Sequence, residues 1–264
     1  MPELPDVEVF RRYLERHAGG ADIVEAEVRD SRCLEDIAAS RFERLLAGTR
    51  LGRTRRHGKH LFVRLTPDAW LTLHFGMTGF LRHVSEDEEP DYSRIAFHLA
   101  GGGSLHYILK RMLGRAGITG SPEAFIDEHD LGPDALDLDS GAFDELLQSV
   151  RGGVKSLLMN QARIAGIGNI YSDEMLFQAG VHPAGRCGDL DAGARGRLDD
   201  ARRNVLETAI EREAHPERFP EKWLLPYRNE GERCPRCGGS IRREVVSGRG
   251  SYFCDTHQER FRTS

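Results

Sequence analysis

The spacing of apolar residues changes along the chain and divides it into regions of different structure. Apolar positions recur at helical spacing from residue 7 until Ala18-Gly19-Gly20 ends the pattern, which predicts a short N-terminal helix. From residue 23 to about 118 they instead form short runs separated by Gly, Pro and acidic turns, for example residues 60–65, 69–75, 95–99 and 104–109. This pattern predicts a β-rich domain that contains one further helix near residues 41–46.

Past Pro122 the apolar pattern becomes helical again. Amphipathic stretches cover residues 142–150, 170–179 and 192–212, and each is bounded by Gly, Pro or Asp. The last segment, from Gly231, is rich in Gly and Arg and has room for one β-hairpin. The sequence therefore predicts a β-rich domain, a helical domain and a small C-terminal module.

Composition narrows the class of protein. The chain has 264 residues, of which 39% are hydrophobic and 30% charged, which is typical of a globular protein. At about 150 residues per domain, this length favours about two domains. No run approaches the ~20 apolar residues that a membrane span needs, and the opening MPELPDVEVF lacks the basic and apolar stretches of a secretory signal. We therefore expect a cytosolic protein without a membrane partner.

The net charge of −5 conceals two basic regions. Residues 51–64 carry five basic residues and no acid, and residues 231–264 carry seven arginines against four acids, which leaves −13 for the rest of the chain. Taken alone, such charge runs are more often solvated surfaces than binding sites. If they do bind phosphate, the acidic remainder predicts a narrow footprint on nucleic acid, with few contacts beyond the two regions.

The cysteines indicate a metal site. Their number is odd and three of them crowd one end, which argues against a disulfide framework; the five are Cys33, Cys187, Cys234, Cys237 and Cys254. The last three form, with His257, the pattern C-x2-C-x16-C-x2-H. Two close ligand pairs on tight turns, joined by a hairpin, are what a tetrahedral Zn²⁺ requires. The sequence predicts one zinc ion per chain.

This zinc is expected to be structural. All four ligand positions are filled by the protein, so none remains for a catalytic water. About 34 residues cannot build a hydrophobic core, so metal binding would supply the folding free energy of the module. A hairpin fixed in this way would present Arg249 as a rigid guanidinium for a phosphate, although an isolated hairpin arginine is more often only solvated.

The N-terminus offers a second kind of chemistry. Removal of Met1 would expose the secondary α-amine of Pro2, and an α-amine has a pKa near 8, so a useful fraction is neutral and nucleophilic at physiological pH. Attack on a sugar C1′ would give a cationic iminium that drives loss of the base and then of the phosphates. Glu3 is placed to act as a general acid, but Met-Pro-Glu openings are common, and alone this one carries little weight.

The combination of motifs resembles the formamidopyrimidine-DNA glycosylase and endonuclease VIII family. The motifs occur in the order of the family and span nearly the whole chain: MPELPDVE at the start, RRHGKHL at 55–61, HFGMTGFLR at 74–82, LGPDAL at 131–136, residues 157–183 and the C-terminal cysteine pattern. The PELP opening is more similar to the formamidopyrimidine branch.

The resemblance implies an α+β fold and a DNA-repair activity. The expected parts are an N-terminal β-sandwich catalytic domain with a short N-terminal helix, a helix-two-turn-helix domain and a zinc-finger hairpin, over residues 1–120, 121–228 and 229–264. The implied activity is base excision on damaged double-stranded DNA, by a glycosylase step and then β,δ-elimination. A monomer associated with the bacterial nucleoid is expected.

The resemblance also assigns roles to individual residues. It implies that Pro2 is the Schiff-base nucleophile, Glu3 the catalytic acid and Lys59 a contact to the phosphate beside the lesion. Asn169 and Arg249 match the phosphate-binding pair of the two C-terminal motifs. These roles fit a lesion that is turned out of the base stack while the kinked backbone is held.

A second set of residues is implied to fill the space that the flipped base leaves. Met77 matches the intercalating methionine of the family, although a methionine in an apolar stretch is more often a core residue. Arg111 and Leu113 align with a second wedge, in which the family normally has a phenylalanine. Leu113 would stack more weakly on the opposite strand.

Departures from the family pattern leave the preferred lesion open. Ala162 stands where the purine-selective branch has a lysine, and residues 217–223 (ERFPEKW) stand where that branch has a Gly-rich loop that closes over 8-oxoguanine. His257 replaces a cysteine as the fourth zinc ligand. The substrate can be an oxidised pyrimidine, a ring-opened or oxidised purine, or a bulkier adduct.

Two other functions compete with the glycosylase. A DNA-damage binding protein of the same fold would have no use for a proline amine at its N-terminus, so Pro2, Glu3 and Lys59 favour catalysis. A metal-dependent nuclease would need an open Asp/Glu/His metal site, and the sequence indicates no such cluster.

Overall fold

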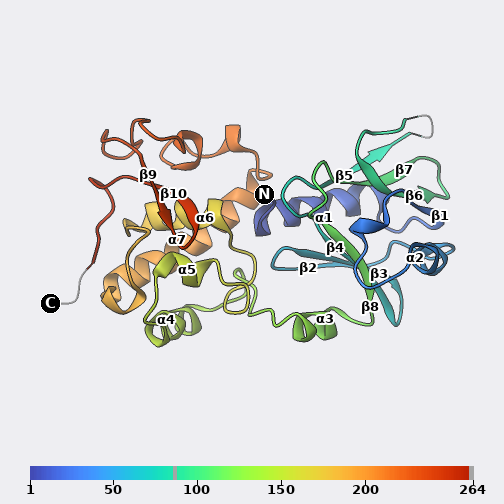
Figure 1. Cartoon of the computed structure of the whole chain (residues 1–264), viewed down its shortest axis with the longest axis horizontal. Coiled ribbons are helices and arrows are strands. Elements are labelled where there is room, and N and C mark those ends of the chain that lie inside the picture. Colours follow the sequence, from blue (N-terminus) through green and yellow to red (C-terminus); the bar gives the residue numbers. More distant parts are fainter. Residues whose placement is uncertain (86–87, 262–264) are drawn as a thin grey trace. The chain divides into compact units, whose positions relative to one another are not determined.

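The computed structural model describes residues 1–85 and 88–261 and forms two compact units, Met1–Asp130 and Leu131–Ser264 (Figure 1). The first unit contains α1 (Leu4–Ala18), β1 (Ile23–Val28), α2 (Ala39–Leu46), β2 (Thr54–His57), β3 (His60–Thr66), β4 (Ala69–His74), β5 (Phe80–Val84), β6 (Ser93–Leu99), β7 (Ser104–Ile108), β8 (Arg115–Thr119) and α3 (Pro122–Glu128). The second contains α4 (Ser140–Ser149), α5 (Val154–Leu158), α6 (Asn169–Ala179), α7 (Ala192–Glu211), β9 (Arg242–Val246) and β10 (Arg249–Phe253).

The first unit is a sandwich of two antiparallel four-stranded sheets. Their strand orders are β1-β6-β7-β5 and β2-β3-β4-β8. Side chains of both sheets share one core with the apolar face of α1, as Leu61, Phe97 and Leu14 illustrate, all fully buried. Each such side chain contributes about 1.5–3 kcal/mol by leaving water. The predicted N-terminal helix and β-sandwich are confirmed.

The second unit is built from helices and one hairpin. The chain turns before α4 and again between α5 and α6, and the two turns are joined by backbone hydrogen bonds from Gly132 N to Gln161 O (2.9 Å) and from Ala135 N to Ala165 O (2.9 Å). Strands β9 and β10 pair in antiparallel register around Ser247-Gly248. The predicted helical domain and C-terminal hairpin are confirmed. Among the described residues, no helix is both long and apolar enough to cross a membrane.

Helix α6 differs from the amphipathic helix that its sequence predicts. Its polar residues Ser172, Asp173 and Glu174 are as fully buried as Leu176 on its apolar side. The reason is tertiary: α7 packs along the helix and β10 contacts it, while the chain before the zinc finger hydrogen-bonds its carboxylates. Such burial of charge requires specific partners.

Glu174 makes the stability of this unit depend on pH. Burial raises the pKa of its carboxyl from 4.5 to about 7, although Gln178 and the backbone N–H groups of Leu224 and Leu225 donate to it and partly lower the pKa. Between pH ~4.5 and ~7 the folded chain therefore binds the proton that the unfolded chain has lost. We expect the free energy of unfolding to fall by about 3 kcal/mol as pH rises across this window, at ~1.4 kcal/mol per pKa unit.

Denaturant unfolding at pH 5 and pH 8 of the wild type and of Glu174→Gln measures this effect. The variant carries no titrating proton and should lose this part of the pH dependence. Asp6 shifts in the same direction, so the difference between the two proteins isolates Glu174. An equal pH slope in both proteins would contradict the assignment.

Candidate active site, nucleic-acid interface and zinc site

The N-terminal motif folds into the start of α1. Glu3 is the N-cap residue of the helix, and its fully buried side chain accepts from the backbone of Asp6, while the side chain of Asp6 accepts from Glu3 N at 2.9 Å. This reciprocal capping box fixes the position of the carboxylate. Met1 is 45% exposed, so a trimming enzyme has access to the residue that must leave before the Pro2 nitrogen becomes an amine.

Asp6 is a member of this site that the sequence did not single out. Burial raises the pKa of its carboxyl to about 6; the hydrogen bond from Glu3 N opposes this rise and the charge of Glu3 adds to it. The N-terminal ammonium also lowers the pKa of Asp6. A carboxyl that titrates near neutrality beside an amine and a second carboxyl is typical of acid–base sites. The signal in the sequence is the capping-box spacing from Glu3.

Lys59 lies in a tight turn at the end of the second sheet. Strands β2 and β3 pair His57 with His60, which leaves Gly58-Lys59 as a two-residue turn in which Gly58 has φ +54°. Such turns require glycine or a similar residue with positive φ. The turn holds Lys59 at the rim of the sandwich.

His74, at the end of β4, accompanies Lys59 and was missed by the sequence prediction. Desolvation, helped by the charges of Lys59 and Arg115, lowers its pKa to about 4. Its Nδ1 lies 3.4 Å from Gly76 N, which donates to it. His74 is therefore a neutral imidazole at physiological pH, and it links the Lys59 turn to the loop that carries Met77.

The structure brings the predicted wedge residues together. Gly76 has φ +58°, and a Cβ there would lie 2.4 Å from the backbone of Leu113, so the β4–β5 loop rests directly on the β7–β8 loop. Arg111 N also donates to Thr78 Oγ1 at 3.2 Å. Met77 is 39% exposed and Leu113 46% exposed. Met77 is therefore not a core residue, and the two apolar side chains stand on adjoining loops.

The predicted phosphate-binding pair also lies together, in the second unit. Asn169 is the first residue of α6, and its Nδ2 donates to Gly250 O at 3.1 Å. Arg249, the neighbour of Gly250, begins β10 and is exposed. One hydrogen bond thus joins the helix start to the hairpin, and it sets the spacing between the two side chains.

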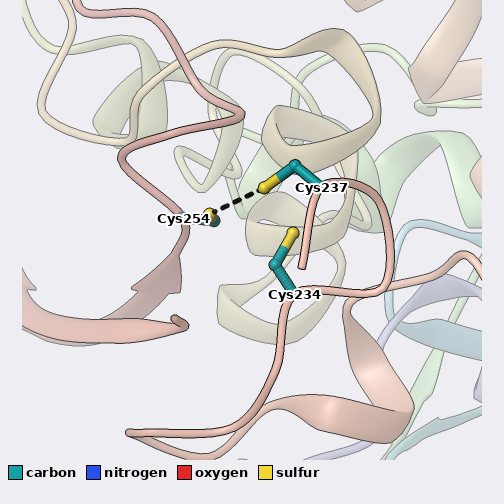
Figure 2. A group of neighbouring side chains, drawn as sticks. All are labelled: Cys234, Cys237 and Cys254. Atoms are coloured by element: carbon teal, nitrogen blue, oxygen red, sulfur yellow. Dashed lines mark hydrogen bonds between the residues drawn. The ribbon is translucent and has the colours of Figure 1, made fainter. Parts of the chain in front are cut away.

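The three cysteines of the C-terminal motif form a cluster. Their sulfur atoms all lie within 4.8 Å of one another, and Figure 2 shows the side chains of Cys234, Cys237 and Cys254 pointing toward a common centre. The Sγ atoms of Cys237 and Cys254 are 3.6 Å apart, close to the ~3.8 Å edge of a tetrahedron with Zn–S bonds of about 2.3 Å. The predicted zinc site is confirmed, with three thiols as its described ligands.

The surroundings of the cluster fit a metal. A Cβ at Gly239 would lie 3.3 Å from Cys254 Sγ and 3.4 Å from Cys237 Sγ, so this glycine leaves room beside the sulfurs. Gly239 N also donates to Cys237 Sγ at 3.4 Å and lowers the pKa of that thiol. Burial raises the pKa of Cys254 to about 11, so a thiolate there needs a bound cation to balance its charge.

His257 stands beside this cluster rather than within it. Its Nε2 lies 2.8 Å from Phe177 O, and its ring packs on that of Phe177 at 4.7 Å. Donation from Nε2–H to a carbonyl leaves the lone pair on Nδ1, the arrangement usual for a zinc-bound histidine. Its role as fourth ligand stays a prediction.

Comparisons with known proteins cover the same segments. Residues 1–116 match the profile of the formamidopyrimidine-DNA glycosylase N-terminal domain, residues 131–220 that of the formamidopyrimidine-DNA glycosylase H2TH domain, and residues 231–256 that of a zinc finger found in FPG and IleRS. The formamidopyrimidine-DNA glycosylase of Pelotomaculum thermopropionicum is 32% identical, over 98% of this chain and 99% of its own length. That of Heliobacterium modesticaldum is 34% identical, over 98% and 100%.

Solved structures agree with this match along the whole chain. Lactococcus lactis Fpg in complex with DNA containing an abasic site superposes with a TM-score of 0.88 and 28% identity, covering 97% of this chain and 99% of that one. MutM in complex with DNA containing carbocyclic 8-oxo-G gives the same score and identity, with 98% and 100% covered. The chain therefore belongs to the formamidopyrimidine-DNA glycosylase family.

Proposed function

We propose that the chain is a DNA glycosylase of base excision repair with an associated abasic-site lyase activity. The observation that carries this proposal is the N-terminal site, in which Pro2 directly precedes a fully buried Glu3 held as the N-cap of α1. Relatives of the same name and structures of relatives bound to DNA support it. A protein that only binds damage has no need of this arrangement.

The reaction follows from the groups at that site. The nitrogen of Pro2, free once Met1 is removed, attacks C1′ of the damaged nucleotide and loses its proton. The bond from C1′ to the base breaks with its electrons on the base, which takes up a proton as it leaves. Glu3 gives a proton to the sugar ring oxygen as the ring opens, which leaves an iminium cation. The iminium acidifies the C2′ proton, so the 3′ phosphate and then the 5′ phosphate leave by successive elimination. Water then releases Pro2 from the sugar remnant.

DNA is held by contacts from both units. Lys59 binds the phosphate beside the lesion, and Asn169 with Arg249 bind phosphates through the helix start and the hairpin, which are joined at Gly250. Met77, Arg111 and Leu113 enter the space left by the flipped base from their adjoining loops. Because the phosphate contacts are few and the rest of the chain is acidic, we expect the protein to cover only a short stretch of DNA around the lesion.

The segment before the zinc finger bears on the choice of lesion. In place of a Gly-rich loop, it carries Phe219 and Trp223, both buried, with ring centroids 5.0 Å apart. The next residues, Leu224 and Leu225, donate their N–H groups to Glu174. A segment fixed at these points cannot swing over a flipped base as a flexible loop does. We expect ring-opened purines and abasic sites to be better substrates than 8-oxoguanine.

A panel of duplexes tests the proposal. Each duplex carries one lesion (a formamidopyrimidine, 8-oxoguanine, an oxidised pyrimidine or an abasic site), and base release and strand cleavage are scored separately. We expect the wild type to give both products from the formamidopyrimidine duplex and to release 8-oxoguanine more slowly. We expect the variant Met77→Ala to release damaged bases from duplex DNA more slowly than the wild type. Tight binding without either product would favour a damage-binding protein. If 8-oxoguanine were the best substrate, the inference that residues 217–223 cannot close over a flipped base would be wrong.

The remaining expectations belong to this proposal. We expect one zinc ion with His257 as fourth ligand, a monomer bound to damaged double-stranded DNA, and a place in the bacterial cytoplasm at the nucleoid. The division into catalytic, helix-two-turn-helix and zinc-finger parts over residues 1–120, 121–228 and 229–264 is proposed as well. Bacterial relatives support the setting.

A further inference from the structure

A buried carboxylate lies one helical turn after Asn169. Asp173 and Lys155 have fully buried side chains, and Lys155 Nζ donates to Asp173 Oδ1. The other carboxylate oxygen, Oδ2, accepts from Arg228 Nε at 3.0 Å, from Arg228 Nη2 at 2.7 Å and from Tyr252 N at 3.2 Å. One carboxylate thus collects four donors from three other segments of the second unit.

These donors attach the zinc-finger hairpin to α6. Tyr252 belongs to β10, and Lys155 Nζ also donates to the hydroxyl of its buried neighbour Ser251. Arg228 lies with its guanidinium carbon 4.5 Å from the centroid of the Tyr252 ring, and its Nη2 is 3.4 Å from Gly250 O. Residues 250, 251 and 252 are therefore each held by this group of contacts.

The same helix carries the predicted phosphate ligand. Asn169 and Asp173 are four residues apart and so lie on one face of α6. Asn169 uses its Nδ2 on Gly250 O, which fixes β10 at the residue next to Arg249. The contacts at Asp173 add to this hydrogen bond beside Arg249, whereas the contact of His257 Nε2 with Phe177 O holds the finger one turn further along α6.

We infer that Asp173 is a positioning residue, which sets the hairpin on α6 so that Arg249 and Asn169 meet DNA phosphates at a fixed spacing. The inference rests on the proposed function, because it assumes that Arg249 binds phosphate. Asp173 itself does not touch DNA. Its role is to make an exposed arginine on a two-stranded hairpin rigid.

An electrostatic role and a positioning role of Asp173 predict opposite changes in DNA affinity for Asp173→Asn. Loss of a negative charge near a DNA-binding surface should by itself strengthen binding. Loss of the anchor should weaken it, because the amide offers one acceptor atom and two N–H groups to a site that presents only donors. A weaker complex is therefore evidence for the positioning role rather than for electrostatics.

The experiment measures the salt dependence of binding to a duplex that contains a tetrahydrofuran abasic-site analogue. Each phosphate contact contributes about 0.9 to the slope of log Kd against log salt. We expect Arg249→Ala and Asp173→Asn each to lower the slope by close to this amount and to weaken binding on the order of tenfold at low salt. The double variant should lose no more than either single variant.

Two further variants separate positioning from stability. Asp199→Asn disturbs another buried ion pair of the same unit, with Arg202, and should lower the melting temperature while its salt slope stays at the wild-type value. Arg228→Lys keeps the charge but loses the paired donors, and it serves if Asp173→Asn does not fold. A wild-type slope in Asp173→Asn, or slopes that add in the double variant, would overturn the inference. A wild-type slope in Arg249→Ala would instead overturn the phosphate assignment.

Discussion

A chain whose Pro2 nitrogen is free should be trapped on abasic-site DNA by borohydride, and the same chain with its N-terminus extended should give no adduct. The nitrogen of a proline that follows another residue is part of a peptide bond and has no nucleophilic lone pair. Borohydride reduces only an iminium, so the covalent adduct reports the Schiff base directly. We expect the loss to be complete within detection.

The experiment compares one protein sample before and after removal of an N-terminal tag. An N-terminal tag is placed before Pro2 with a protease site that leaves proline first, and trapping is measured before and after cleavage. The tag-bearing sample should still bind the abasic duplex, because its phosphate contacts are intact. No adduct after cleavage would refute the lyase activity, and an adduct before cleavage would show that another amine is the nucleophile.

The variant Glu3→Gln tests the role of Glu3 as general acid. The glutamine keeps an oxygen that can cap α1, so the fold should be retained, while the proton donor is lost. We expect release of a damaged base to fall by about 10²–10⁴-fold, the usual contribution of a general acid. Trapping on a preformed abasic site should persist, because part of that sugar is already an open aldehyde. Equal losses in both assays would indicate that Glu3 acts through the helix rather than as an acid.

Removal of zinc should weaken DNA binding. Zinc binding to such modules supplies about 10–16 kcal/mol of folding free energy, so a chelated finger should unfold and release Arg249 from its place beside Asn169. A charge-assisted hydrogen bond contributes about 1.5–3 kcal/mol, so loss of the Arg249 contact should weaken binding by about 10- to 10²-fold. Anisotropy on the abasic-analogue duplex, with zinc release followed by a chromogenic chelator, measures both events.

The controls use His257, the predicted fourth ligand. His257→Cys should retain zinc, and His257→Ala should bind it more weakly. Readdition of zinc should restore binding to the chelated wild type, and circular dichroism should show the β-sandwich of the first unit unchanged throughout. Full affinity after zinc loss would mean that the finger does not hold Arg249.

Local patterns were sufficient for much of the fold. The N-terminal helix, the runs that became β3, β4, β6 and β7, and the long helix α7 follow from apolar periodicity, because each element buries one face. The C-x2-C-x16-C spacing predicted the thiol cluster for a similar reason: two tight turns and a hairpin leave few ways to separate the pairs. The motif resemblance supplied the roles of Pro2, Glu3, Lys59, Asn169 and Arg249, which no periodicity shows.

Other features depend on contacts between distant segments. The local sequence around Met77 is typical of a core methionine, but the residue is 39% exposed, on a loop whose Gly76 lies against the backbone of Leu113. The pKa of Asp6 and that of His74 are shifted by burial, which depends on what covers them. No local pattern contains this information.

The sequence by itself predicted most of the elements and the cluster of three cysteines, since these depend on residue type and spacing within short segments. Only the tertiary structure decided that α6 is buried on its polar side, with Asp173 and Glu174 as anchors for chain 50 to 80 residues away. Burial of a charge is stabilising only when its partners arrive from elsewhere in the chain. The sequence of residues 170–179 alone does not show which distant residues will pair with Asp173 and Glu174.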